Sequence, residues 1–418
     1  MKNRTNKRKI VNDPIYGFIN ISSDIIFDLV EHPYFQRLRR IKQLGLTNFV
    51  YPGANHTRFQ HGLGSLHLME IAINDIRSKG HEITPEESEA VIIAILLHDI
   101  GHGPFSHALE YAIIENFNHE QISFLMMKEL NRQFDNRLSL AIKIFQNKYH
   151  KKFLHQLVSG QLDMDRLDYL NRDSFFTGVS EGVIGTDRII KMLNVVDDQL
   201  VVEAKGIYSI EKFLIARRLM YWQVYLHKTV LSAENLLVNI LKRAKKLASE
   251  GHELFATPAL HYFLYNKIKM DDLNHTDSTR EILNNFSKLD DNDIVVSTKV
   301  WADHKDKVLS KLCSHLTNRL LFKIEIQNKP FSESRINEIK ATVNKRLRYT
   351  AEELAYFVFT GTISNNTYNY NSNDDRIKIL YNNGILVDIA EASDMLNIAV
   401  LSKIVKKHFV CYPKELNI

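Results

Sequence analysis

Apolar residues recur every three or four positions through the first part of the chain, and this spacing predicts a largely helical fold. The helical pattern extends from about residue 22 to 250. Within it, the clearest periodic segments are 121–130, 137–147, 151–158, 185–193 and 209–249. One hairpin is expected inside this block, because β-type residues at 199–203 and 207–209 flank a short Ala-Lys-Gly sequence.

The strongest single helix signal comes early in this block. Thr84 can act as an N-cap, Pro85 suits the first helical position, and Glu87 can close a capping box. The eight residues before His98 are all apolar, so this helix must be buried. We expect it to end at about His98, where glycines and a proline follow, and a new helix to begin near Phe105.

The pattern changes beyond residue 250. Stretches rich in asparagine and aspartate separate short β-type runs, which lie at 320–326, 356–360, 385–389 and 408–412. We therefore predict a mainly α fold in two parts. A helical domain occupies 1–250, a smaller α+β domain occupies 251–418, and the boundary between them is approximate.

The composition is typical of a globular protein, with 44% hydrophobic and 25% charged residues in a chain of 418. The longest apolar run is too short to cross a membrane, and the first residues lack the apolar core of a signal peptide. We therefore expect a cytoplasmic protein without a membrane partner. Cys313 and Cys411 lack ligand-like spacing, so both are expected to be free thiols.

The formal net charge is only +5, but five basic residues lie among the first nine. Such an arm can attract partners that carry phosphate, including nucleic acid. A solvated, disordered tail explains the same residues equally well. No motif of a base-stacking module supports the nucleic-acid interpretation.

Four histidine and aspartate residues indicate chemistry, because most of them lie in apolar or tightly turned segments. His98 and Asp99 directly follow the apolar run, and burying both without compensation would cost several kcal/mol. His61 and Asp165 lie in polar motifs far from this pair. Taken singly, each residue is more often a core histidine or a capping aspartate. Together they predict a divalent metal site, and the ligand types leave manganese, iron, zinc, cobalt, nickel and magnesium open.

These residues belong to motifs that follow one another along the chain, at 12–17, 35–45, 51–61, 97–107, 119–121, 162–169 and 225–228. Through these motifs the sequence resembles the HD superfamily of metal-dependent phosphohydrolases. Within it, the closer likeness is to the deoxynucleoside triphosphate triphosphohydrolases. The likeness covers about residues 9–230 and implies an HD-type helical core for the N-terminal domain.

The resemblance implies roles for the residues around the metal. The family's metal ligands correspond to His61, His98, Asp99 and Asp165. Its catalytic histidine and the groups that support it correspond to His102, His119 and Glu110. The resembled enzymes carry aspartate at the last position, and glutamate extends the reach by one methylene group, which can retune the supported histidine.

The resemblance also implies contacts with substrate. Phosphate-contacting positions correspond to Arg58, His107 and Arg166. Relatives usually have lysine at the third position, whereas arginine can make a bidentate phosphate contact. Positions around the sugar and base correspond to Gln43, Leu44, Tyr169, Asp173, Arg217, Tyr225 and His227. The first two lie against the sugar in the family and leave no room for a ribose 2′-hydroxyl group, while Tyr225 also fits an aromatic stripe of a helix core.

A second nucleotide site is implied at Lys9, Asn12, Glu31, Gln36 and Arg39. In regulated relatives an activator nucleotide bound there promotes a tetramer, so we expect a homo-oligomer, either a dimer or a tetramer. Glu31 replaces the usual aspartate and changes the group that would face a guanine edge. Alternatively, residues 36–40 form the solvated face of an amphipathic helix that packs through Phe35, Leu38 and Ile41.

The expected activity is hydrolysis of deoxynucleoside triphosphates to deoxynucleosides and inorganic triphosphate. A water molecule activated by the metal would attack the α-phosphorus, and a histidine would protonate the leaving oxygen. An additional magnesium ion can accompany the nucleotide. Two alternatives stay open. One is an HD phosphohydrolase for another phosphoester, such as a nucleoside monophosphate, a cyclic nucleotide or an alarmone, and the other is a nucleotide-sensing or nucleic-acid-binding protein.

Overall fold

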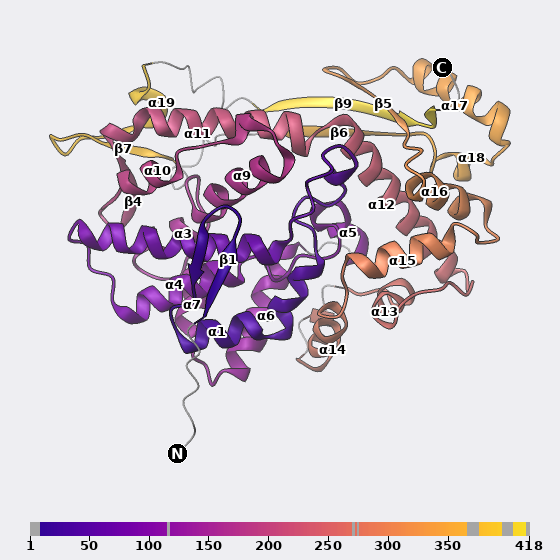
Figure 1. Cartoon of the computed structure of the whole chain (residues 1–418). Helices are drawn as coiled ribbons and strands as arrows, with labels where there is room; N and C mark the ends of the chain where they lie inside the picture. Colours follow the sequence, from indigo (N-terminus) through magenta and orange to yellow (C-terminus); the bar gives the residue numbers. More distant parts are fainter. Residues whose placement is uncertain are drawn as a thin grey trace.

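The computed structural model of the chain describes residues 9–114, 118–269, 272–273, 276–365, 376–394 and 404–414 (Figure 1). Within these ranges the side chains of His107, Glu110, Tyr111 and Thr276 are not described. Helices form most of the structure, and three small sheets accompany them. Residues 1–8 of the basic N-terminal arm lie outside the described residues, so the role of the arm stays a prediction.

The N-terminal part starts with a hairpin and continues as closely spaced helices. Its elements up to residue 192 are β1 (Ile10–Asp13), β2 (Gly17–Asn20), α1 (Asp24–Glu31), α2 (Pro33–Gln36), η1 (Arg37–Arg40), η2 (Thr47–Phe49), α3 (Arg58–Ser78), α4 (Pro85–Leu97), η3 (Ser106–Leu109), α5 (Glu110–Ile113), α6 (His119–Gln133), α7 (Ser139–Phe145), α8 (Lys152–Val158), α9 (Met164–Thr177), η4 (Ser180–Gly182) and α10 (Thr186–Met192), the η elements being 3₁₀ turns. The helix predicted after Thr84 is confirmed as α4, with Glu87 closing the capping box. Helix α3 contacts both α4 and α9 in the core.

The predicted hairpin is wrong in its pairing. Strand β4 (Gln199–Glu203) forms, but it pairs with the preceding strand β3 (Leu193–Val196) across a turn at Asp197 and Asp198. Both turn residues have positive φ, 49° and 58°, a conformation that aspartate adopts more readily than most residues. The segment 207–209, predicted as the second strand, instead begins helix α11 after a short 3₁₀ turn.

The predicted helical segment 209–249 is interrupted. Helix α11 (Ile207–Met220) passes into a π-helical turn at Tyr221–Tyr225, and α12 (Lys228–Ser249) begins after His227. The His227 side chain accepts a hydrogen bond from a backbone N–H of the next turn and so caps α12. Turns of the π type inside helical segments are frequent near functional sites.

The helix expected near Phe105 is reduced to short turns. Phe105 and Ser106 both have left-handed backbone, with φ of 55° and 54°, and only the one-turn elements η3 and α5 follow. Left-handed conformations of residues other than glycine cost about 1–3 kcal/mol each. Contacts from elsewhere in the fold must therefore hold this loop.

Beyond residue 250 the structure combines helices and strands, as predicted. The helices are α13 (Pro258–Tyr265), α14 (Thr276–Phe286), α15 (Asp291–Trp301), α16 (Lys307–Thr317), α17 (Glu333–Leu347), α18 (Ala351–Leu354) and α19 (Ile389–Ala392). The strands are β5 (Lys323–Gln327), β6 (Phe359–Asn365), β7 (Lys378–Leu380), β8 (Leu386–Asp388) and β9 (Val405–Tyr412), and they include the four predicted β-type runs with shifted ends. Strand β9 lies between β5 and β6, whereas β7 and β8 extend the β3–β4 hairpin (Figure 1).

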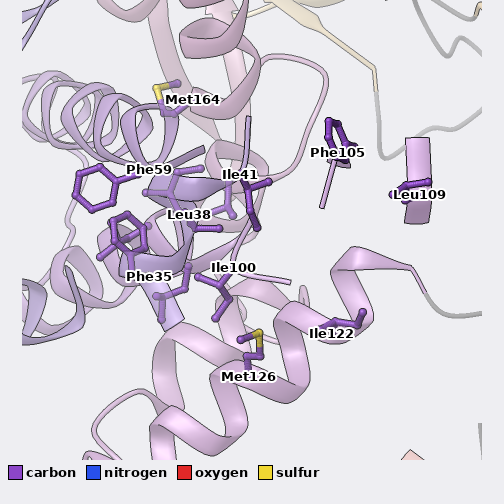
Figure 2. Packing of buried hydrophobic residues seen from close by; sticks show 14 of the residues in the cluster. Phe35, Leu38, Ile41, Phe59, Ile100, Phe105, Leu109, Ile122, Met126 and Met164 are labelled. Atoms are coloured by element: carbon purple, nitrogen blue, oxygen red, sulfur yellow. The ribbon is translucent and has the colours of Figure 1, made fainter. Parts of the chain in front are cut away.

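One cluster of buried apolar side chains extends across residue 250. Figure 2 shows Phe35, Leu38 and Ile41 close to Phe59 and Ile100 within this core. The mainly α fold with a smaller α+β C-terminal region is confirmed. The domain boundary near residue 250 stays a prediction.

Two features of the composition can be compared directly with the structure. Cys313 and Cys411 are free and buried, as predicted, and burial raises the pKa of both thiols. Among the described residues, no helix combines the length and apolar character needed to span a bilayer.

Candidate metal centre and active site

The four residues predicted to bind a metal come together from three helices. His61 lies in the first turn of α3, His98 and Asp99 follow the end of α4, and Asp165 lies in the first turn of α9. Potential ligand atoms of His61, His98 and Asp99 all lie within 4.8 Å of one another. The Oδ1 atom of Asp165 is 3.0 Å from His61 Nε2 and 3.6 Å from His98 Nε2.

Two ring nitrogens in this cluster lack a hydrogen-bond partner among the described residues. They are the buried Nε2 atoms of His61 and His98. The Nδ1 atoms of the same rings lie 2.7 Å from the Asp168 carboxylate and 2.6 Å from the Ile95 carbonyl oxygen. A proton held on Nδ1 by these acceptors leaves a lone pair on Nε2, which is the form that binds a metal. The donor set therefore fits a divalent cation.

The carboxylates dominate the electrostatics of this cluster. Burial alone would lower the pKa of His61, but the nearby carboxylates of Asp165 and Asp168 raise it to about 10. Burial likewise opposes a charge on His98, yet Asp99 and Asp165 raise its pKa. The site attracts positive charge strongly, either as protons on the imidazoles or as a metal ion in their place.

A buried ion network supports the cluster from behind. Asp168, which holds His61, accepts two hydrogen bonds of 2.8 and 2.9 Å from Arg172. Arg172 also donates to Asp13 at 2.8 Å and thereby ties β1 to α9. Gly64 permits this approach, because a Cβ atom there would lie 2.0 Å from the Asp168 carboxylate. The sequence analysis missed Asp168 and Arg172, although an acid and a base four residues apart in a helical motif is a usable signal.

Arg58 and His102 both contact the candidate ligand Asp99. Arg58 donates one hydrogen bond to Asp99 Oδ2 and another, of 2.8 Å, to the Ser106 hydroxyl group. His102 Nδ1 lies 3.2 Å from Asp99 Oδ1, and its ring stacks on His119 with centroids 3.9 Å apart. Burial and the charge of Arg58 lower the pKa of His102 well below its ordinary value.

Asp291 holds the strained loop from the C-terminal half of the chain. It begins helix α15, and its carboxylate accepts hydrogen bonds from the backbone N–H groups of Phe105 at 2.7 Å and Lys42 at 2.9 Å. Burial raises the pKa of Asp291 to about 6, although the two hydrogen bonds oppose this shift. One side chain thus connects the loop after His102 to the segment that carries Gln43.

Arg37 also holds the loop that contains His102 and Phe105. Its side chain is fully buried, and it donates hydrogen bonds of 2.7–2.9 Å to the backbone carbonyls of Ile100, His102 and Leu289. The guanidinium carbon also lies 4.9 Å from the centroid of the Phe286 ring. Asp291 and Arg37, together with Leu289, form what we call the loop clamp. No motif in the sequence indicates it, because its parts are about 250 residues apart.

Asp173, predicted to lie near the sugar, is held at both carboxylate oxygens. Its Oδ1 atom lies 2.7 Å from His56 Nε2, and its Oδ2 atom accepts a 2.7 Å hydrogen bond from the Tyr225 hydroxyl group. The Tyr169 and Tyr225 rings lie side by side with centroids 6.2 Å apart. The backbone N–H of Gln43 donates to the carbonyl of His56 at 3.0 Å. The structure therefore groups these predicted residues around a histidine that the sequence analysis did not select.

Arg166 and Arg217 are held against the turn that precedes α9. Arg166 donates to the Gly160 carbonyl at 2.6 Å and to the Asp163 carboxylate at 3.1 Å. Arg217 donates to the Gln161 side chain at 3.1 Å. Both guanidinium groups are thus fixed near the first turn of α9, where Asp165 lies.

The last predicted substrate and catalytic residues are Leu44, His227, His107 and Glu110. Leu44 is partly buried against the apolar core, and His227 caps α12. The side chains of His107 and Glu110 lie outside the described part of the chain, so their roles stay predictions.

The residues of the predicted activator site lie near the N-terminus. Gln36 donates to the Val30 carbonyl and accepts a 2.8 Å hydrogen bond from Arg39, whose guanidinium lies 3.5 Å from the centroid of the Phe59 ring. The alternative account is confirmed in part, because Phe35, Leu38 and Ile41 are fully buried, but Arg37 between them is buried rather than solvated. The activator site itself stays a prediction, with its other members at Lys9, Asn12 and Glu31.

This fold and this cluster define a helical protein with a buried centre of histidine and aspartate that can hold a metal. The family model of the HD domain matches residues 58–173, which include all four candidate ligands, and the model of the HD associated region matches residues 184–256. A crystal structure of a phosphohydrolase from Bacteroides thetaiotaomicron is similar over 97% of this chain and 99% of that one, with 57% sequence identity and a TM-score of 0.92. The chain belongs to the HD-domain family of phosphohydrolases.

Two curated relatives extend this comparison. The uncharacterized protein YwfO of Bacillus subtilis is 31% identical, over 99% of this chain and 94% of its own length. The deoxynucleoside triphosphate triphosphohydrolase SAMHD1 homolog of Dictyostelium discoideum is 34% identical, over 59% of this chain and 51% of its own length. The second likeness therefore concerns about half of that relative.

Proposed function

We propose that the chain is a metal-dependent hydrolase that converts deoxynucleoside triphosphates to deoxynucleosides and inorganic triphosphate. The observation that carries this proposal is the pair of buried Nε2 atoms of His61 and His98, which have no hydrogen-bond partner among the described residues and lie between the carboxylates of Asp99 and Asp165. The likeness to SAMHD1 relatives, whose printed name includes this activity, supports the choice of substrate.

His61, His98, Asp99 and Asp165 would hold a divalent cation. Such an ion supplies two things to phosphoester hydrolysis, a lowered pKa of water and polarisation of a phosphoryl oxygen. Asp168 and Arg172 fix the tautomer and orientation of His61 through the network described above. The hydrogen bond from Arg58 leaves Asp99 Oδ1 directed toward the histidines.

Charge on the phosphate requires cations beside the metal. Arg58 lies next to the centre, where it contacts Asp99 and Ser106, and Arg166 is fixed near Asp165. These two arginines are the proposed phosphate-binding cations. His102 and His119 are the proton-handling pair, because their stacked rings lie beside Asp99. We assign the protonation of the leaving ester oxygen to this pair, with His107 and Glu110 as its predicted neighbours.

The sugar side of the site supports a nucleotide. The Oε1 atom of Gln43 is buried without a hydrogen-bond partner in the described part of the chain. The Asp173 carboxylate, which His56 connects to the segment of Gln43, is a further acceptor. Unsatisfied buried acceptors need a donor. A deoxynucleoside triphosphate offers one free sugar hydroxyl group, at C3′. In the proposed complex Leu44 lies against the sugar and leaves no room for a ribose 2′-hydroxyl group, and Tyr225 lies around the sugar and base.

Product analysis tests the proposed reaction. Protein loaded with manganese, iron, cobalt, nickel, zinc or magnesium is incubated with each deoxynucleoside triphosphate, alone and in mixtures, in ¹⁸O-labelled water. We expect inorganic triphosphate that carries the label, together with unlabelled deoxynucleoside. Release of orthophosphate or pyrophosphate would show cleavage of a phosphoanhydride bond instead. Activity only on nucleoside monophosphates or cyclic nucleotides would assign the centre to another phosphoester.

The mixtures also test regulation. We propose an activator nucleotide bound near Lys9, Asn12, Glu31, Gln36 and Arg39, a homo-oligomer, an additional magnesium ion on the nucleotide and a cytoplasmic location. Hydrolysis of one nucleotide only in the presence of another, with a matching change in sedimentation, is the expected signature of activation.

A further inference from the structure

His56 lies where the segment that carries Gln43 meets helix α9. Its side chain is buried, and its ring stacks on Phe176 with centroids 4.5 Å apart and planes 13° apart. Gly53 makes room for this stack, because a Cβ atom there would lie 2.5 Å from the Phe176 carbonyl oxygen. The ring is thus fixed in one plane by packing, independently of its polar contacts.

The backbone and the side chain of His56 reach two different predicted sugar contacts. Its carbonyl oxygen accepts a 3.0 Å hydrogen bond from the Gln43 N–H, and a β-bridge between Lys42 and Thr57 fixes the same two segments. Its Nε2 atom lies 2.7 Å from Asp173 Oδ1. One residue therefore sets both the backbone position of Gln43 and the orientation of the Asp173 carboxylate.

Among the described residues, Asp173 is the one polar partner of this imidazole. The Nδ1 atom of His56 is buried and has no hydrogen-bond partner in the described ranges. Within those ranges, no lysine or arginine forms an ion pair with Asp173, so its orientation depends on His56 Nε2 and the Tyr225 hydroxyl group. A carboxylate held by two directional donors keeps its remaining lone pairs aimed in a fixed direction.

We infer that His56 is a positioning residue that enables the enzyme to recognise the free sugar hydroxyl group of its substrate. The inference rests on the proposed function, because Gln43 and Asp173 serve there as the acceptors for that hydroxyl group. Without the His56 imidazole, Asp173 keeps only the hydrogen bond from Tyr225 and can rotate away. Binding of the triphosphate and the chemistry at the metal do not involve His56.

A comparison of two substrates separates this role from a general structural one. We compare kcat/KM for a deoxynucleoside triphosphate and for its 2′,3′-dideoxy analogue, which lacks the hydroxyl group. His56→Leu removes the donor, His56→Gln keeps an N–H near the position of Nε2, and Phe176→Leu removes the stack but keeps the imidazole. The melting temperature and the bound metal of each variant show whether the fold is intact.

We expect His56→Leu to lower kcat/KM for the deoxy substrate roughly 10–100-fold, as for other residues that orient a binding group. Most of the loss should appear in KM, and the value for the dideoxy analogue should change less than about threefold. His56→Gln should restore most of the preference for the hydroxyl group, and Phe176→Leu should retain it. Equal losses on both substrates in His56→Leu, or no rescue by His56→Gln, would overturn the inference.

Calorimetric binding of the same two nucleotides in a His98→Ala background repeats the comparison without turnover. If the wild-type protein hydrolyses no deoxynucleoside triphosphate, the proposed function is wrong, but the binding comparison still tests the role of His56. If the protein hydrolyses deoxynucleoside triphosphates and His56→Leu leaves the preference for the hydroxyl group unchanged, only the inference about His56 is wrong.

Discussion

The metal cluster and the loop clamp are both buried, charged assemblies, but they differ in how their polar atoms are used. In the metal cluster, the Nε2 atoms of His61 and His98 face carboxylates but form no hydrogen bond with any residue that the structure describes. In the clamp, each carboxylate oxygen of Asp291 accepts a backbone hydrogen bond. The first assembly is arranged for a ligand from outside the chain, and the second for the chain itself.

Burial therefore has a different meaning in the two assemblies. Buried polar groups are normally satisfied, so an unsatisfied set that is also surrounded by opposite charge indicates a missing partner. The clamp shows the opposite pattern around a strained segment, since Phe105 and Ser106 both have left-handed φ. Removing a part should therefore abolish activity in the first region and reduce stability in the second.

The largest effect is expected for Asp165→Asn in the metal cluster. Loss of one carboxylate ligand should lower kcat/KM by roughly 10³-fold, because polarisation by the metal contributes several kcal/mol. The same substitution removes a negative partner of the buried His61 and His98 imidazoles, so the stability of the metal-free protein should fall as well. Steady-state kinetics and chemical denaturation measure the two effects. If the variant keeps a tenth of the wild-type kcat/KM, Asp165 is not a ligand of the metal.

Arg37→Met tests the clamp. The substitution leaves three buried backbone carbonyls without their donor, so we expect the free energy of unfolding to fall by about 3–5 kcal/mol. Urea denaturation followed by circular dichroism measures it. Arg39→Met, in the same 3₁₀ turn but exposed, is the matched control and should change stability by less than about 1 kcal/mol. Similar losses in both variants would contradict the distinction.

The pH dependence of stability gives a second test of the clamp. Asp291 has a folded-state pKa of about 6, above the value of about 4 in the unfolded chain. Protonated Asp291 therefore adds to the free energy of unfolding, and this stabilisation is complete below pH ~4. It declines as pH rises and is lost once pH passes about 6, a change of up to roughly 3 kcal/mol. The difference in unfolding free energy between wild type and Asp291→Asn, measured from pH 4 to 8, should show this decline.

Asp303 is exposed, so the Asp303→Asn variant serves as the control. Its free energy of unfolding should equal that of the wild type at every pH. A wild-type profile parallel to that of Asp291→Asn would show that Asp291 titrates normally in the folded protein.

The smallest effect is expected from the network behind the metal. Asp168→Asn weakens the hold on His61 Nδ1 while keeping the shape of the side chain. We expect metal affinity to fall about 10–100-fold in a calorimetric titration. Asp187→Asn, on an exposed part of α10, should leave affinity unchanged. Unchanged affinity in Asp168→Asn would make this network purely structural.

The sequence predicted those features that depend on local signals. The Thr84 capping box, the apolar run of α4 and the His98-Asp99 pair all lie between residues 84 and 99, and all are confirmed by the structure. The prediction that His61 and Asp165 join the His98-Asp99 pair came from the resemblance of their motifs to a known family, and not from their spacing along the sequence. The assigned roles of these residues stay proposals.

Other features depended on competition between local and distant interactions. The turn at Asp197 and Asp198 replaced the predicted Ala-Lys-Gly turn, because aspartate accepts positive φ and the residues after β4 form helix α11, which buries Ile210, Phe213 and Leu214. The loop at Phe105 is short and strained because Asp291, far along the chain, supplies hydrogen bonds that no local pattern reveals. The Asp173 pairing with His56 likewise joins residues more than 100 positions apart.

The number of bound metal ions decides whether the histidine and aspartate cluster is a metal site. Purified protein is dialysed against a divalent metal, and the bound metal is determined by mass spectrometry for the wild type, for His61→Ala, His98→Ala and Asp165→Asn, and for the clamp variant Asp291→Asn. We expect about one ion at the cluster in the wild type and in Asp291→Asn, with loss of that ion in the three cluster variants. Wild-type protein without bound metal, or cluster variants that bind it as the wild type does, would show that the cluster holds no metal.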